Sequence, residues 1–143
     1  MGPNEKTLQK IRLISDNLLY QEAVDFVAKN EMPENSQLNG LLEYSRQWDG
    51  FEKYIKKQED REWTGKKEHY KEFYSRLRIY LFNDLRNQTK NEFNLIPTDL
   101  VRKELQKRLD EVFPLLAQEY IRHLVAEALY KNATNSKKDS QKG

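Results

Sequence analysis

The residues of this sequence whose chemistry could serve a function are lysines and arginines that interleave with aromatic residues between Gln47 and Lys90. Residues 46–90 hold 12 Lys/Arg against 8 Asp/Glu, a net charge of +4, although the whole chain carries only +2. Eleven of the 16 aromatic residues lie between Tyr44 and Phe93. Positive charge beside aromatic rings is the combination that binds a nucleic-acid backbone and its bases. This segment therefore predicts a nucleic-acid surface, with an ordinary helical core as the alternative explanation for the rings.

The basic residues fall on one side of each of two expected helices. In the first, a 3.6-residue period puts the lysines opposite the apolar positions, and in the second the basic residues follow one edge of the apolar face. Two such edges side by side would form a groove that follows a phosphate backbone. The candidate RNA-binding residues are Lys53, Lys56, Lys57, Arg61, Lys67, Lys71 and Arg78.

The alternative for these basic residues is an ordinary solvated face. Five acidic residues lie among them and neutralise part of their field, namely Glu52, Glu59, Asp60, Glu68 and Glu72. Of the aromatic residues, Trp63 is the best candidate for stacking on a base, followed by Tyr44 and Tyr80. Because Trp63 stands beside Thr64-Gly65 at the end of an expected helix, it could instead cap the bundle.

Catalysis finds little support in the sequence. The two histidines, His69 and His123, belong to no HExxH motif or His–Asp pair, and no Gly-rich phosphate loop is present. A helical ribonuclease that depends on His69 is the remaining enzymatic alternative, whereas His123 suits a partly buried structural role. With no cysteine and no carboxylate pair in an apolar stripe, we expect no catalytic residue, no metal and no cofactor.

Composition places the chain among helical proteins of the cytoplasm. Its 143 residues, 34% of them charged and 37% hydrophobic, suit one helical domain. The absence of cysteine fits a reducing compartment. Because no apolar run approaches the roughly 18 residues of a membrane span, we expect a cytoplasmic location and no membrane partner.

Apolar spacing predicts an all-α protein, a single compact bundle of five to six helices over residues 1–132. The expected helices are one that ends before Pro33, one from about Asn35, one around Trp48 to Gln58, one from about Lys66 to Asn87, and a long final helix capped by Thr98. Proline has no backbone donor, so Pro114 must kink or split the final helix near Asp110. Residues 133–143 are polar and predict a disordered tail.

The helix expected over Lys66 to Asn87 is apolar on more than one side, because Ile79 and Phe82 point away from its main apolar face. Such a helix is either central in a bundle or carries a second contact surface. The second possibility gives an alternative function, that of a helical adaptor for a protein partner with no nucleic-acid role. Ile79 and Phe82 would then form its docking ridge.

Apolar and aromatic residues between positions 36 and 85 also follow the pattern of a known family. They are Ser36-Gln37-Leu38, Leu41-Leu42, Phe51, Tyr54-Ile55, Gln58, Arg61, Phe73-Tyr74 and Leu77. In these residues the chain resembles the small all-helical subunit of type III CRISPR effector complexes. The resemblance implies a compact helical bundle with a structural role, in which several copies stack beside the subunits that carry the guide RNA.

The resemblance also implies partners for the basic residues. The seven candidate residues would contact the backbone of the guide or target RNA without sequence specificity, and other subunits of the ribonucleoprotein would be protein partners. Residues 1–45 carry 4 Lys/Arg against 7 Asp/Glu, a net charge of −3. An acidic region and a basic region on one molecule favour head-to-tail association of copies.

Overall fold

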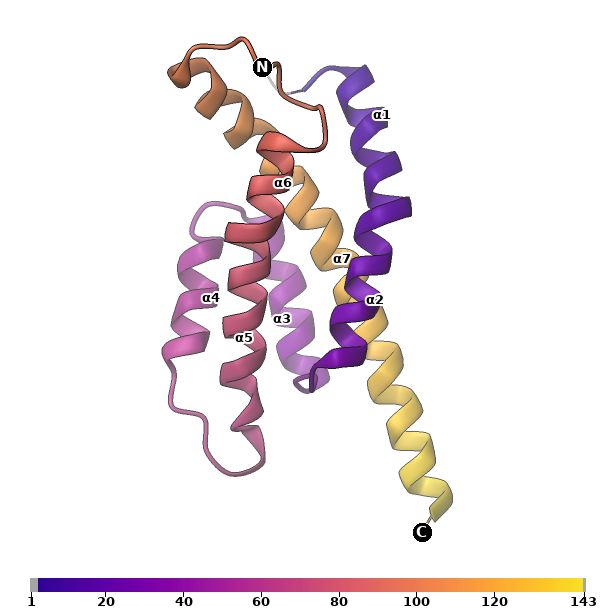
Figure 1. Cartoon of the computed structure of the whole chain (residues 1–143). Helices are drawn as coiled ribbons and strands as arrows, with labels where there is room; N and C mark the ends of the chain where they lie inside the picture. Colours follow the sequence, from indigo (N-terminus) through magenta and orange to yellow (C-terminus); the bar gives the residue numbers. More distant parts are fainter. Residues whose placement is uncertain (1–2, 143) are drawn as a thin grey trace.

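The computed structural model describes residues 3–142, and it gives the side chains of all of these except Lys66 and residues 137–142. Within these residues the chain forms five continuous helical segments and no strand (Figure 1). The segments are α1 (Glu5–Ile14), a π-helical turn (Ser15–Leu19) and α2 (Tyr20–Lys29); α3 (Asn35–Arg46); α4 (Phe51–Asp60); α5 (His69–Ile79), a π-helical stretch (Tyr80–Leu85) and α6 (Arg86–Asn91); and α7 (Arg102–Lys142). A 3-10 turn, Gly65–Lys67, precedes α5. The predicted all-α bundle is confirmed.

Helix α7 is the centre of the bundle. It packs against α2, α3 and α6, while α4 packs against α5 on the other side of α3 (Figure 1). Leu116, Tyr120 and Leu124 of α7 are fully buried in the core. Pro114 lies inside α7 without ending it, so this helix is continuous rather than split. No helix among the described residues is long and apolar enough to cross a membrane.

Two helical segments bury a side chain at every fourth position. The buried positions are Ile11, Ser15, Leu19, Ala23 and Val27 in the first segment, and Leu77, Leu81, Leu85 and Thr89 along α5 and α6. An α-helix repeats every 3.6 residues, so a strict four-residue spacing would drift away from the core. The π-helical turns absorb the difference because each turn takes up an extra residue. As a result Leu19 is buried while the neighbouring Leu18 is 37% exposed.

The two ends of α7 differ from the expected helix in different ways. The helix begins at Arg102, where the Val101 carbonyl accepts from the Leu105 N–H at 2.9 Å, so the prediction that Thr98 caps it is wrong. Thr98 instead belongs to a turn. This turn lets Leu100 pack against the core before the helix begins. At the other end the backbone is helical to Lys142. The side chains of residues 137–142 and the whole of Gly143 lie outside the described residues, and disorder of residues 133–143 stays a prediction.

Two fully buried tyrosines provide a test of the core. The Tyr74 hydroxyl donates to Gln37 Oε1 at 2.9 Å, whereas the Tyr120 hydroxyl has no hydrogen-bond partner among the described residues. We expect Tyr74→Phe to lower the free energy of unfolding by about 1 kcal/mol, and Tyr120→Phe to leave it unchanged or raise it. Urea denaturation of both variants measures the difference. Equal losses would contradict the hydrogen-bond assignment.

Candidate nucleic-acid interface

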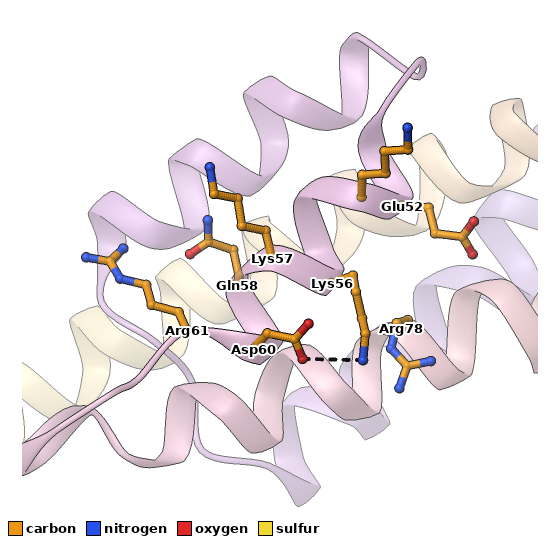
Figure 2. A pocket seen from close by; sticks show the side chains of 8 residues that line it. Glu52, Lys56, Lys57, Gln58, Asp60, Arg61 and Arg78 are labelled. Carbon is orange, nitrogen blue, oxygen red and sulfur yellow. Dashed lines mark ion pairs between the residues drawn. The ribbon is translucent and has the colours of Figure 1, made fainter.

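A surface hollow of about 1110 Å³ lies over the outer face of α4 (Figure 2). We call it the α4 hollow. Five basic side chains, two carboxylates and one amide line it, so positive charge is in excess. They are Lys53, Lys56, Lys57, Arg61, Arg78, Glu52, Asp60 and Gln58. The structure thus brings together five of the seven basic residues that the sequence selects.

Helix α4 presents these side chains because its opposite face is buried. Phe51 and Ile55 are fully buried, and Glu59, one turn further on, is only 9% exposed. Gly50 precedes the helix with a φ of 83°, a left-handed conformation that glycine adopts without strain. This turn starts the helix at Phe51. The charged positions between the buried ones are left facing solvent.

The buried carboxylate of Glu59 forms a two-pronged ion pair with Arg78 of α5. Arg78 Nε donates to Glu59 Oε2, and Arg78 Nη2 donates to Glu59 Oε1 at 3.0 Å. These hydrogen bonds lower the pKa of Glu59 below its ordinary 4.5, although burial opposes them. A guanidinium engaged on a carboxylate in this way has fewer donors left for a phosphate. Arg78 therefore joins α4 to α5 as well as lining the hollow.

The remaining cations of the α4 hollow separate into a paired one and three unpaired ones. Lys56 Nζ lies 3.3 Å from Asp60 Oδ1. Among the described residues, no carboxylate lies within ion-pair distance of Lys53, Lys57 or Arg61. Figure 2 shows Lys57 and Arg61 projecting to one side of α4, with Lys56 and Asp60 on the other. Lys53 and Lys57 are one turn apart on α4, about 6 Å along its axis, and Arg61 is the residue that ends the helix; we call the three the unpaired stripe.

The two other candidates, Lys67 and Lys71, lie outside the α4 hollow. Lys67 belongs to the 3-10 turn before α5, and its Nζ lies 3.4 Å from Glu34 Oε1. Lys71 lines a smaller adjoining hollow together with Arg61 and Trp63. Lys67, Lys71 and Arg78 therefore do not form the single basic edge that a regular helix would give them. Lys67 falls outside such an edge because the α-helix begins only at His69, whereas Lys71 and Arg78 both lie on α5 but line different hollows.

Trp63 caps the bundle. Its Nε1 donates to the Gln58 carbonyl at 2.8 Å, and its half-buried ring meets that of Tyr70 edge-on with the centroids 4.9 Å apart. The Arg61 guanidinium lies 4.6 Å from the centroid of the same ring. This cation–π contact keeps Arg61 positioned beside the hollow while leaving its charge in place.

The other two aromatic candidates differ in exposure. The hydroxyl of Tyr80 donates to Glu22, and its half-buried ring stacks on Tyr120 with the centroids 4.3 Å apart. Tyr44 is 49% exposed and stacks flat on Tyr54 of α4, with the centroids 4.0 Å apart. Of the three candidates, Tyr44 is thus the one whose ring offers an open side to a base.

Neither histidine lines the α4 hollow. His69 Nε2 lies 3.2 Å from the Met32 carbonyl oxygen and its Nδ1 lies 3.4 Å from Glu31 Oε2. His123 Nε2 lies 2.9 Å from Ser15 Oγ, and burial lowers the pKa of His123 below 6.5. The expected partial burial of His123 is confirmed. Among the described residues, no group of three or more His, Asp or Glu side chains has a metal-binding arrangement.

An aromatic cluster beside α4 is a feature that the sequence did not reveal. Ile79 is 46% exposed, but Phe82 is half-buried against Trp48 and Phe113, with ring centroids 6.0 and 5.8 Å away. Ile79 and Phe82 therefore do not form one exposed ridge. Phe113 is far from the other two rings in the sequence, so no local spacing could have indicated their contact.

The ion pair between Glu59 and Arg78 predicts a pH-dependent stability. Because the folded state lowers the pKa of Glu59, the pair stabilises the fold above about pH 4.5, and this contribution is lost as the pH falls through the lower folded pKa. Glu59→Gln should cost about 1–3 kcal/mol at pH 7. The difference from the wild type should shrink below pH 4.5 in urea denaturation. As a control, Glu43→Gln at the exposed pair of Glu43 with Arg46 should have little effect on stability. A cost of Glu59→Gln that stays constant down to pH 3 would contradict the lowered pKa of Glu59.

Comparison with known proteins gives no match. No protein-family model, no curated protein and no solved structure is significantly similar to this chain.

Proposed function

We propose that this protein is a non-catalytic RNA-binding subunit of a ribonucleoprotein complex, which contacts the RNA backbone without reading its sequence. The observation that carries the proposal is the unpaired stripe of Lys53, Lys57 and Arg61 in the α4 hollow. Phosphate binding needs cations that the protein has not already neutralised with its own carboxylates. Contacts from such side chains to phosphates position a nucleic acid but carry no base sequence.

The resemblance of residues 36–85 gives the proposal a narrower form, a small structural subunit of a cytoplasmic type III CRISPR effector complex. Its partners would be the guide or target RNA, other subunits and further copies of itself. An all-α bundle of 143 residues is consistent with this form. Residues 1–45 carry a net charge of −3 and the α4 hollow has an excess of basic side chains, and regions of opposite charge on one molecule favour head-to-tail stacking.

A helical protein–protein adaptor is the second candidate. The exposed Ile79 on α5 favours it, since an apolar side chain on a helix surface can serve as an anchor for a partner. Under this alternative the basic residues of α4 serve only to keep the surface solvated. The two candidates differ in whether RNA binding depends on the unpaired stripe.

The first prediction of the proposal is salt-sensitive binding that depends on α4. Fluorescence anisotropy with a labelled single-stranded RNA of about 40 nucleotides provides enough length for several sites. If each cation of the unpaired stripe contacts one phosphate, affinity should fall about 40-fold between roughly 50 and 300 mM salt. Lys53→Glu combined with Lys57→Glu should abolish this binding while circular dichroism still reports a helical protein.

The matched control for this experiment is Lys103→Glu combined with Lys107→Glu. These two exposed lysines have the same spacing on α7, so the control makes the same change in net charge away from the α4 hollow. If both double variants weakened RNA binding equally, the net charge of the protein would explain the effect, and this result would contradict a site on α4. Shortened RNA after incubation would instead favour a ribonuclease, which His69→Ala should then inactivate.

A second prediction separates the paired from the unpaired lysines of α4. Lys57→Met should weaken RNA binding more than Lys56→Met, although the two substitutions remove the same charge from adjacent positions. The reason is that the Lys56 ammonium is already engaged by Asp60 at 3.3 Å, whereas Lys57 has no such partner. Anisotropy titrations at roughly 50 mM salt measure both. A larger effect of Lys56→Met would show that the RNA follows the other side of α4.

A further inference from the structure

A second hollow, of about 420 Å³, opens beside the α4 hollow and has aromatic walls. Trp48, Phe82 and Phe113 supply these walls, with their ring centroids 5.6 to 6.0 Å apart. The rings come from the connection before α4, from the π-helical stretch after α5 and from α7. Trp48 and Phe82 are half-buried and so retain exposed ring surface. We call this hollow the aromatic pocket.

The rim of the aromatic pocket is charged and joins it to the α4 hollow. Arg86 lies with its guanidinium 5.8 Å from the centroid of the Phe113 ring, and its Nη2 is 3.8 Å from Asp110 Oδ1. Glu52 and Lys53 line both hollows. Lys53 is also one end of the unpaired stripe. A phosphate held by Lys53 would therefore place its own nucleoside at the mouth of the aromatic pocket.

We propose that the aromatic pocket binds one unpaired nucleobase of an RNA whose backbone follows the unpaired stripe. This inference rests on the proposed function and adds the class of RNA. The exposed ring surface of Trp48 and Phe82 can stack on one face of a base, and the volume falls within the roughly 300–1,000 Å³ of small-molecule sites. Asp49, Glu52 and Asp110 line the pocket and outnumber its two cations, so it repels a phosphate but accepts hydrogen bonds from the N–H groups of a base.

The pocket thus selects single-stranded over double-stranded RNA. In a duplex the bases are stacked and paired, and the groove edges give side chains little access to their faces. A single strand can turn one base outward while its phosphates stay on the unpaired stripe. The preferred ligand is therefore an RNA single strand, or an unpaired position in a longer RNA.

The chain contains two tryptophans, which makes a direct experiment possible. In a Trp63→Phe variant the remaining tryptophan is Trp48, in the wall of the aromatic pocket. We would titrate this variant with a 12-nucleotide oligo(rA), with an abasic oligonucleotide of equal length and with a 12-base-pair RNA duplex. Anisotropy would follow binding, and tryptophan fluorescence would follow the pocket. We expect oligo(rA) to quench Trp48 and to bind about tenfold more tightly than the abasic strand, which should leave Trp48 unchanged.

A pair of phenylalanine variants tests the walls. Phe82→Leu keeps an apolar side chain but removes a ring, so it should reduce the quenching and the preference for oligo(rA) while binding of the abasic strand persists. Phe93→Leu, at a half-buried phenylalanine outside the pocket, should change neither. The comparison of oligo(rA) with the abasic strand needs neither of these variants, so it tests the pocket even if Phe82→Leu does not fold.

The outcomes separate this inference from the function on which it rests. Binding of all three RNAs without any change in Trp48 fluorescence would overturn the aromatic pocket and leave the proposed backbone binding intact. Equal quenching by the abasic strand would also overturn it, because no base would then be needed. Absence of binding by every RNA, even at low salt, would overturn both the pocket and the proposed function.

Discussion

The candidate site depends on the burial of one stripe of α4 against its neighbours. Phe51 and Ile55 are fully buried, and burying each such side chain contributes about 1.5–3 kcal/mol. This stripe fixes the rotation of α4 about its axis, so the lysines on the opposite face cannot turn inward. It also carries Glu59 into a position where Arg78 of α5 is its partner. One contact thus joins two helices and engages one of the cations that the hollow contains.

The two sequence interpretations of the basic residues describe different sides of the same helix. On one side, Lys56 pairs with Asp60 four residues later, as on the solvated surface of many helices. On the other side, Lys57 and Arg61 project without a carboxylate partner (Figure 2). Net charge counted along the chain cannot separate these situations, because it includes paired and unpaired cations alike. The number of cations available to a phosphate is therefore smaller than the charge of residues 46–90 suggests.

The sequence predicts the helices well because apolar spacing reports which face of each helix is buried. It predicts the site less well because spacing within a helix does not say which residues of two helices meet. Glu59 and Arg78 are 19 positions apart, and their pairing depends on how α4 and α5 are aligned. Spacing also fails at Leu18, which is exposed because the π-helical turn changes which side chains of its helix face the core. Helix α7 begins later than the sequence predicts because the apolar residues of the loop before it pack against the core.

The aromatic pocket is the part of the site furthest from sequence prediction. Its rings come from one connection and two helical segments, and each ring taken alone fits a core position in its own segment. The rings meet because α7 passes beside the connection that leads into α4. Its location next to Lys53 then gives the two hollows complementary chemistry. A cationic surface suits the phosphates, and an acidic, aromatic-walled pocket suits a base.

A stripe of three cations has a consequence for how the proposed subunit would work. So few phosphate contacts correspond to weak, non-specific binding, with Kd values on the order of 10⁻⁴ to 10⁻⁶ M. Copies arrayed along one RNA strand would bind much more tightly, because each copy held by its neighbours meets the strand at a high effective concentration. Residues 1–45 carry a net charge of −3 while the α4 hollow has an excess of basic side chains, a difference in charge that would favour such an array. The modest charge of the α4 hollow is therefore better suited to a repeated subunit than to an RNA-binding protein that acts alone.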